Sequence, residues 1–387
     1  MKYSFKKDND WVLIITMLLL SLFGLIMVFS SSYVWAFDHF SNSYFFIQRQ
    51  VVWFFIAIVL FLFIMHVPYR YYQKLSPFII LGSGIMLVVV LFAGTEINGA
   101  QRWLRFGPLT LQPSEFVKLG MIIYLAQVYS QKQAYIDQFV KGVMPPLIVV
   151  GAILAMILAQ PDLGTATSIL IVTGLIVFFS GAKMRHLLML LGVGVFLFIF
   201  AVMNASYRLE RITGYRDPFN DAFGSGYQLI QSYIAMAHGG LSGVGLGQSV
   251  QKLLYLPEPH TDFILAIISE ELGVIGVAFV MICHGIILFK GVTIGTRCKS
   301  SFGSLLAFGI VFQIAIQVIF NVGAVTGLLP ITGIPLPFIS NGGSSLLVTM
   351  ASIGILANIS RNQRQQQRLE EEKELISTKP TGFGVSQ

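Results

Sequence analysis

Long apolar stretches dominate this chain, and their lengths match those of membrane spans. A helix that crosses about 30 Å of hydrocarbon needs roughly 20 mostly apolar residues. A window of that size finds about ten such runs, near residues 11–32, 47–66, 77–94, 114–131, 143–160, 165–181, 186–203, 263–289, 302–322 and 344–359. The pattern predicts an all-α integral membrane protein, a polytopic bundle of about ten transmembrane helices with a large outer loop between spans 7 and 8.

The polar segments between these runs define the expected organisation of the chain. We expect a cytoplasmic N-terminus (1–10), a ten-span membrane domain (11–359) and a mobile cytoplasmic tail that begins helical (360–387). The first run lacks an A-x-A cleavage site and is long for a signal peptide, so we interpret it as a retained span. Three segments are too long or too rich in Gly and Pro to be simple connections, and we predict them to be outer loops: 95–113, 204–262 and 323–343.

The positions of lysine and arginine predict the orientation. With the N-terminus in the cytoplasm, inward segments hold 17 of the 25 basic residues, in keeping with the positive-inside rule. These are Lys2, Lys6, Lys7, Arg70, Lys74, Lys132, Lys141, Lys183, Arg185, Lys290, Arg297, Lys299, Arg361, Arg364, Arg368, Lys373 and Lys379. Both termini are therefore expected in the cytoplasm.

Composition supports the membrane assignment and excludes other classes. Of the 387 residues, 55% are hydrophobic and only 11% are charged, whereas a soluble domain has about 25% charged residues. The net charge of +7 follows from the topology, so we predict no nucleic-acid binding. Two cysteines, Cys283 in an apolar run and Cys298 in a basic loop, do not suggest a disulfide framework.

Charged residues within or beside the spans are candidates for function, because each costs at least about 2.5 kcal/mol on insertion scales. Glu115 and Lys118 lie three residues apart at the start of the fourth span. They form either a structural ion pair or part of a polar cavity. Asp162, in a short outer turn, is either a helix N-cap or a site residue.

A second group of acids surrounds the eighth span. Asp262 precedes the apolar run and is either an N-cap or a general base, with Glu258 and His260 beside it. Glu270 and Glu271 follow about two turns later. Adjacent helical residues point about 100° apart, so burying both acids predicts a central helix.

Several motifs argue against other kinds of site. The segment 239–249 (GGLSGVGLGQS) has the glycines of a phosphate loop but no G-K-[ST], and its small residues favour close packing. The six histidines are scattered, so we predict no metal site built from protein ligands. The chain contains no G-x-S-x-G motif, so the sequence gives no support for covalent acyl chemistry.

The segment 321–345 (NVGAVTGLLPITGIPLPFISNGGSS) is the strongest local signal. Three prolines and several glycines prevent a continuous helix, yet the residues are apolar. Irregular backbone at membrane depth is tolerated only where it is buried in protein or lines a cavity. The segment therefore predicts a re-entrant structure that is compatible with a site.

These blocks resemble the SEDS family of bacterial shape, elongation, division and sporulation proteins. The segment 321–345 is similar to the family's signature, and INGAQRWLRFGPLTLQPSEFVKL, QPDLGTA and LPEPHTDFILAIISEELGVIG resemble its other blocks in the right order. The resemblance covers nearly the whole chain and is greatest to the division members, then the sporulation and rod-shape members. Asn341 departs from the small or aromatic residue expected before Gly-Gly.

The resemblance implies a peptidoglycan glycosyltransferase that polymerises lipid II at the outer face of the bacterial cytoplasmic membrane, at the division septum. It implies a class B penicillin-binding protein, other division proteins of the membrane and membrane lipid as partners. The family's essential acid matches Asp262, and its fourth-span motif matches Glu115 and Lys118. We expect substrate contacts from Arg102, Asp162, His260, Ser340, Gly342 and Gly343, and Mg or Mn as a possible cofactor for the diphosphate.

Two other functions stay open on the sequence alone. A lipid II flippase would use the same intramembrane acids and broken helix. A scaffold that only recruits division proteins would need neither Asp262 nor Glu115 for growth. The predicted outer position of Asp262 favours the enzyme.

Overall fold

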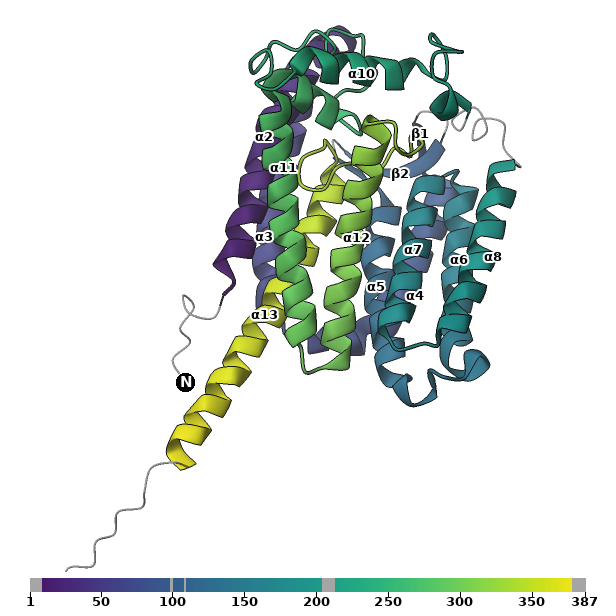
Figure 1. Cartoon of the computed structure of the whole chain (residues 1–387), viewed down its shortest axis with the longest axis vertical. Coiled ribbons are helices and arrows are strands. Elements are labelled where there is room, and N and C mark those ends of the chain that lie inside the picture. Colours follow the sequence, from purple (N-terminus) through teal and green to yellow (C-terminus); the bar gives the residue numbers. More distant parts are fainter. Residues whose placement is uncertain (1–8, 98–99, 108, 204–212, 378–387) are drawn as a thin grey trace, which may run out of the picture.

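The computed structural model describes residues 9–97, 100–107, 109–203 and 213–377, and most of these residues form long helices that run side by side (Figure 1). The helices of the bundle are α2 (Trp11–Phe40), α3 (Phe45–His66), α4 (Arg70–Ala93), α5 (Pro113–Gln131), α6 (Met144–Ala159), α7 (Leu163–Phe179), α8 (Met184–Met203), α11 (Ile264–Arg297), α12 (Ser301–Val325) and α13 (Gly343–Ser377). Seven of the described helices are long and apolar enough to cross a membrane, and α7 and α8 contain shorter apolar stretches. The predicted bundle of about ten helices is confirmed.

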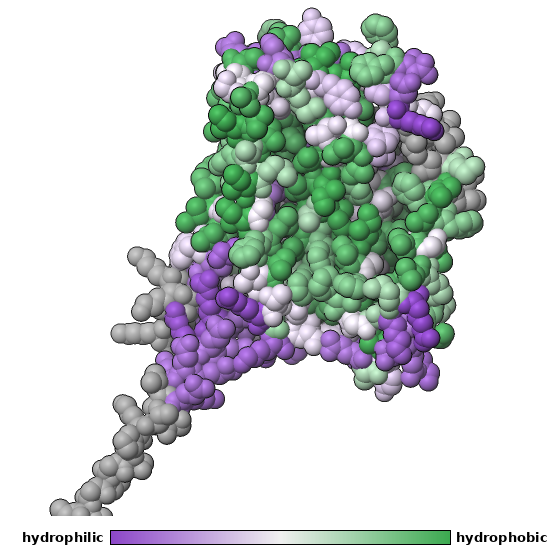
Figure 2. Space-filling view, viewed as in Figure 1, coloured by the Kyte–Doolittle hydropathy of each residue, from purple (hydrophilic) through white to green (hydrophobic). Residues whose placement is uncertain are grey.

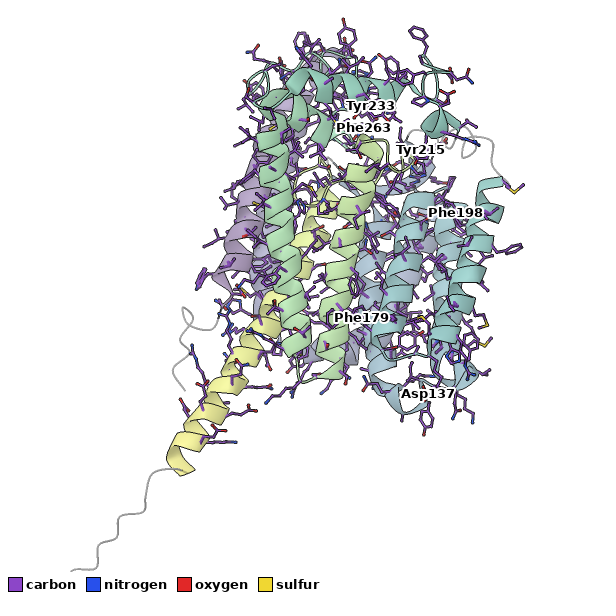
Figure 3. The ribbon with its side chains drawn as sticks, in the orientation of Figure 1. Asp137, Phe179, Phe198, Tyr215, Tyr233 and Phe263 are labelled. Atoms are coloured by element: carbon purple, nitrogen blue, oxygen red, sulfur yellow. The ribbon has the colours of Figure 1, made fainter. Side chains whose placement is uncertain are left out.

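The two ends of the bundle differ in structure. One end, which we call the loop face, carries three strands, helix α10 (Tyr227–Gly239) and the segment 326–342 (Figure 1). The opposite end, the tail face, carries a short 3-10 turn η1 (Gln133–Tyr135), a π-helical turn η2 (Phe139–Val143) and the outward continuation of α13. Apolar side chains cover the flank between them, and polar ones gather at the tail face (Figure 2). Tyr233 lies near the loop face and Asp137 at the tail face (Figure 3).

The expected outer loop 95–113 contains a small antiparallel sheet that the sequence analysis did not predict. Its strands are β1 (Thr95–Ile97), β2 (Ala100–Phe106) and β3 (Leu109–Leu111), in that order. Thr95 pairs with Trp103, and Leu104 pairs with Leu111. Successive side chains of a strand point to opposite faces, so β2 directs alternate residues toward the bundle.

The centre of the bundle is formed by α12 and α13, not by α11 as predicted. Within the most apolar 18-residue window of each helix, 94% of the window is buried in α13 but only 33% in α11. The prediction of a central helix from Glu270 and Glu271 was wrong, because both acids lie in the short part of α11 before its break at Gly273. The loop 249–252 covers both acids, and Ser30 of α2 also contacts Glu271.

Helix α11 is broken at Gly273, whose φ of 64° is a conformation that glycine adopts more readily than other residues. The glycine-rich loop 239–247 fills the break. Val244 and Gly245 donate to the carbonyls of Glu270 and Glu271. The amides of Val274 and Ile275, which follow the break, donate to the carbonyls of Gly240 and Leu241. This contact confirms the close-packing interpretation of the segment 239–249.

The tail begins helical, as predicted. Its described part continues α13 to Ser377 as one helix. Arg364 donates to the carbonyl of Asn9 at 2.8 Å and pairs with Asp10 at 3.1 Å. Lys299 pairs with Glu370 at 2.6 Å. The expected mobile stretch at 378–387 and the N-terminal residues 1–8 lie outside the described residues, as does part of the loop 204–262.

Candidate functional site

A cavity of about 1000 Å³ opens at the loop face. Most of the lining comes from four parts of the chain: the adjoining ends of α2 and α3, the small sheet, the residues before α11 and the broken segment before α13. Gln228 of α10 also lines the cavity. Of the predicted site residues, the cavity brings together Arg102, His260, Asp262, Gly342 and Gly343. These residues are far apart in sequence, so the fold itself assembles the site.

Asp262 is held at the cavity by the backbone around it. Its carboxylate accepts a hydrogen bond from the Thr261 hydroxyl at 3.0 Å, and its carbonyl accepts one from the Asn321 amide at 2.8 Å. The N-cap interpretation of Asp262 is wrong, because α11 begins at Ile264 and Phe263 occupies the N-cap position.

The broken segment forms the wall next to Asp262, where a Cβ at Gly333 would lie 3.9 Å from the carboxylate. Asn321 also donates to the carbonyl of Ile334 at 3.0 Å, which ties this wall to the backbone of Asp262. Gly343 has no room for a side chain, because an added Cβ would meet the Trp53 ring at 2.2 Å. Gly342 donates to Gln50 at 3.3 Å. Ser340 is buried behind the wall, where its hydroxyl accepts from Leu336 at 2.8 Å, so it does not line the cavity.

His260 lines the cavity as a neutral residue. Its ring packs on Phe46 with a centroid distance of 4.2 Å and on Trp35 with one of 5.5 Å. Burial lowers the pKa of His260 to about 3, so the imidazole carries no charge at neutral pH. Its Nδ1 atom is buried and has no hydrogen-bond partner among the described residues. Such an atom is suited to a ligand or a water molecule.

Arg102 and Asp162 form a structural contact at the rim. Arg102 donates to the carbonyl of Gln160 at 2.9 Å and to that of Pro161, and it lies 4.0 Å from the Asp162 carboxylate. Asp162 accepts from the amide of Thr165 at 3.1 Å, which confirms its N-cap interpretation. Asp162 is not part of the cavity lining. Much of Arg102 is thus used to hold the turn between α6 and α7.

The sequence analysis missed two arginines that line the cavity. Arg49 comes from α3, where it stacks on Phe45 at 4.0 Å, and Arg105 comes from β2. The positive charges of Arg49 and Arg105 repel each other. Neither makes an ion pair within the described ranges. Arg49 was detectable, since it falls inside the predicted span 47–66, where a charge needs a reason.

Glu115 and Lys118 lie in a different place from the main cavity. Their side chains form an ion pair of 2.7 Å and are nearly fully buried. They also line a small separate pocket together with Gln313, Gln317, Thr349 and Ser352. The ion-pair interpretation is supported, and the pocket of about 10 Å³ beside the pair has room for about one water molecule. Neither residue lines the cavity that contains Asp262.

The cavity lining includes carboxylate oxygens, which are the ligands that a hard divalent cation prefers. In the described part of the chain, no group of three or more His, Cys, Asp or Glu side chains is arranged to hold a metal. Asp262 and Glu258 both line the cavity. Mg²⁺ is often bound by one or two carboxylates together with substrate phosphates, so these two residues fit a cation that arrives with a diphosphate.

Comparison with protein families identifies relatives of this chain. The model of the FtsW, RodA and SpoVE family, described as cell cycle proteins, matches residues 10–365. Stage V sporulation protein E of Bacillus subtilis is 44% identical over 361 residues, which cover 93% of this chain and 99% of that protein. The probable peptidoglycan glycosyltransferase FtsW of the same organism is 45% identical over 367 residues, covering 92% of this chain and 91% of that protein.

Solved structures agree with these relatives. One similar chain comes from a peptidoglycan synthase complex described as coordinating polymerization and crosslinking. It has a TM-score of 0.78 and 29% identity, and the match covers 93% of this chain and 99% of that chain. Rod shape determining protein RodA of Thermus thermophilus has a TM-score of 0.69 and 26% identity, covering 92% of this chain and 98% of that chain.

Proposed function

The chain belongs to the FtsW, RodA and SpoVE family of cell cycle proteins, and we propose that its loop-face cavity elongates glycan strands from lipid II. It is a multi-pass membrane protein and a peptidoglycan glycosyltransferase. One observation carries the proposal for the site. The same cavity combines a carboxylate on irregular backbone, Asp262, with two arginines that have no carboxylate partner in the described structure, Arg49 and Arg105.

In the proposed reaction the 4-hydroxyl of the acceptor sugar attacks the anomeric carbon of a lipid-linked donor. The new C–O bond forms as the bond to the lipid diphosphate breaks, and the configuration at the anomeric carbon inverts. Asp262 takes the proton of the attacking hydroxyl, and the diphosphate leaves with the electron pair. Such a displacement needs a base at the hydroxyl and positive charge at the leaving group.

Arg49 and Arg105 supply that positive charge in our proposal. Guanidinium groups bind phosphate oxygens through paired hydrogen bonds, which suits a diphosphate. Arg102 contributes mainly by holding the rim, as its contacts to Gln160 and Pro161 indicate. Where Mg²⁺ or Mn²⁺ takes part, Asp262 and Glu258 would hold it, and the ion would neutralise charge on the diphosphate.

The other expected residues have proposed roles around the reacting groups. His260 offers a neutral hydrogen-bonding atom to the sugar, and Gly342 and Gly343 let the backbone approach the substrate. Ser340, Asp162, Glu115 and Lys118 act at a distance, since none of them lines the cavity. They maintain the walls on which the cavity is built.

We further propose the setting in which the enzyme works. The loop face is outside and both termini are cytoplasmic, as the distribution of basic residues supports. A class B penicillin-binding protein is the partner that cross-links the product, and the structural relative from a synthase complex supports this proposal. The role is septal, with sporulation as the second candidate because the sporulation protein is as similar as the division protein.

The test uses the purified full chain with lipid II in liposomes, with and without the partner and a chelator. Polymer that depends on Asp262 is the expected result. Translocation of labelled lipid II across the bilayer without polymer would support a flippase and contradict the proposal. Neither activity under any of these conditions would favour a scaffold.

A further inference from the structure

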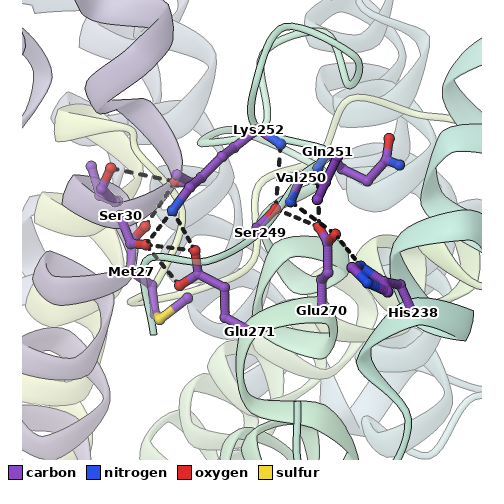
Figure 4. A network of polar contacts seen from close by, with 11 residues as sticks. Met27, Ser30, His238, Ser249, Val250, Gln251, Lys252, Glu270 and Glu271 are labelled. Carbon is purple, nitrogen blue, oxygen red and sulfur yellow. Dashed lines mark hydrogen bonds and ion pairs between the residues drawn. The ribbon is translucent and has the colours of Figure 1, made fainter. Parts of the chain in front are cut away.

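Two adjacent acids on α11, Glu270 and Glu271, are fully buried and lie outside the cavity lining. Both belong to the short helical segment Ile264–Leu272, which starts two residues after Asp262 and ends at the break at Gly273. Their side chains diverge, as adjacent positions on a helix do, and contact different neighbours (Figure 4). Burying two carboxylates is costly unless each is paired, so each of these acids needs its own hydrogen-bond donors or cation.

Glu270 binds the loop that follows α10. Its carboxylate accepts from the amides of Val250 at 3.0 Å and Gln251 at 3.2 Å, from the Ser249 hydroxyl, and from His238 at 2.9 Å (Figure 4). The four donors fix three consecutive loop residues and the end of α10 to one side chain. The loop 249–252 is thereby held on the short segment.

Glu271 joins the same loop to α2. Its carboxylate accepts from Lys252 at 2.6 Å and from the Ser30 hydroxyl at 2.7 Å, and Lys252 lies 3.2 Å from Ser30. Lys252 and Glu271 are 1% and 0% exposed, and the ammonium also lies 4.9 Å from the Tyr33 ring centre. The ion pair is sealed from solvent between α2, the loop and the short segment.

A sealed ion pair is weak evidence for stability, because an apolar pair of similar size is often as stable. What such a pair does fix is relative position. The short segment spans about 12 Å at 1.5 Å per residue, and no flexible linker separates it from Asp262. A shift of Glu271 against α2 therefore moves the backbone that carries Asp262.

We propose that Glu271 and Lys252 are positioning residues for Asp262, which act through the segment Ile264–Leu272. The pair sets where the segment lies against α2, and Asn321 holds the other end at the carbonyl of Asp262. Neither residue touches substrate. This inference rests on the proposed role of Asp262 as the base.

The test compares lipid II polymerisation by the full chain with that of three variants: Lys252→Met, Glu271→Gln and the double variant. Each single variant leaves one buried charge unpaired, so its melting temperature falls. The double variant removes both charges and regains most of the wild-type melting temperature. Its kcat stays at least about 10-fold below wild type, while KM for lipid II changes less than about twofold, because binding groups are untouched.

A purely structural pair predicts a different outcome, namely that kcat recovers together with the melting temperature in the double variant. That result would overturn the proposal. If the double variant does not fold, Ser30→Ala decides, since it keeps both charges and removes one hydroxyl from the network. We expect it to fold and to lower kcat about threefold at constant KM, and a wild-type kcat would again overturn the proposal.

A control variant breaks a more exposed ion pair at the tail face, where Lys290 is 28% exposed and Asp10 also pairs with Arg364. Lys290 lies 3.4 Å from Asp10 there, far along the chain from the cavity residues. The double variant Asp10→Asn with Lys290→Met should keep wild-type kcat. Failure of the wild-type chain to polymerise lipid II would contradict the proposed function, whereas a fully active Glu271→Gln/Lys252→Met variant contradicts only the positioning inference.

Discussion

Two groups of charges at the loop face are built in opposite ways. In the cavity, Arg49 and Arg105 have no ion pair among the described residues, and Asp262 sits on irregular backbone. Nearby, Glu271 and Lys252 pair with each other at 2.6 Å and are closed off from solvent. The two arginines have charge available for a ligand, and the second group uses its charge to hold helices together. The buried, paired charges thus position structural elements, whereas the unpaired charges of the cavity can take part in chemistry.

The largest effect is expected at the open group. Asp262→Asn keeps the size of the side chain and removes the base, so polymerisation should fall about 10³-fold, within the range for loss of a general base. The melting temperature should stay at the wild-type value, because no helix cap is lost. Product chains separated on a gel, together with a thermal unfolding curve, measure both. Normal polymer from a folded variant would remove Asp262 from the mechanism.

The sealed group should respond in stability first. Lys252→Met leaves the Glu271 carboxylate buried without its cation, and breaking one side of such a pair costs about 3 kcal/mol or more. Denaturant unfolding in detergent measures the change. Lys299→Met is the matched control, since its pair with Glu370 is more than half exposed and should be worth less than about 1 kcal/mol. Equal losses in the two variants would contradict the distinction between sealed and open charges.

His260 should make stability depend on pH. Burial lowers its pKa to about 3 in the folded chain, against about 6.5 when unfolded. The unfolded state therefore binds more protons between these values, and stability falls as pH drops below 6.5, by about 2 kcal/mol at pH 5. His260→Gln should remove this part of the dependence in cation-free buffer. If His260→Gln lost as much unfolding free energy as the wild type between pH 7 and pH 5, the burial argument would be contradicted.

The smallest effect is expected from one arginine of the open group. Arg105→Gln removes a charged donor for the diphosphate and should raise KM for lipid II about 10-fold, as expected for one charge-assisted hydrogen bond. Stability should not change, because Arg105 is exposed and has no carboxylate partner in the described structure. Steady-state kinetics and unfolding measure the two quantities. A loss of stability without a rise in KM would make Arg105 a structural residue.

The sequence predicted the spans well because membrane thickness sets their length directly. It also gave the N-cap at Asp162 as one of two alternatives and predicted the close packing of the glycine-rich loop, since both depend on local chemistry. It missed the break at Gly273, and with it the true location of Glu270 and Glu271. One glycine in an apolar helix does not reveal a positive φ, and the loop residues that bind these acids are about 20 residues away in the chain.

The candidate site was predictable in part for a similar reason. Asp262, His260 and the broken segment lie in irregular polar or proline-rich stretches that stand out in an apolar chain. Arg105 and Lys252 do not stand out, because their roles depend on which helices and strands they face. Only the fold distinguishes a lysine sealed against α2 from one on the surface.

The helical continuation of α13, which ion pairs tie to the bundle, affects how this protein can be observed. From Ser360 to Ser377 the helix extends about 25 Å at 1.5 Å per residue, and Arg364 ties its base to Asp10. A spectroscopic label at Glu374 would therefore stay at a nearly constant distance from the bundle. Changes in its signal would report tilting of the whole molecule in the bilayer rather than motion of a loose end.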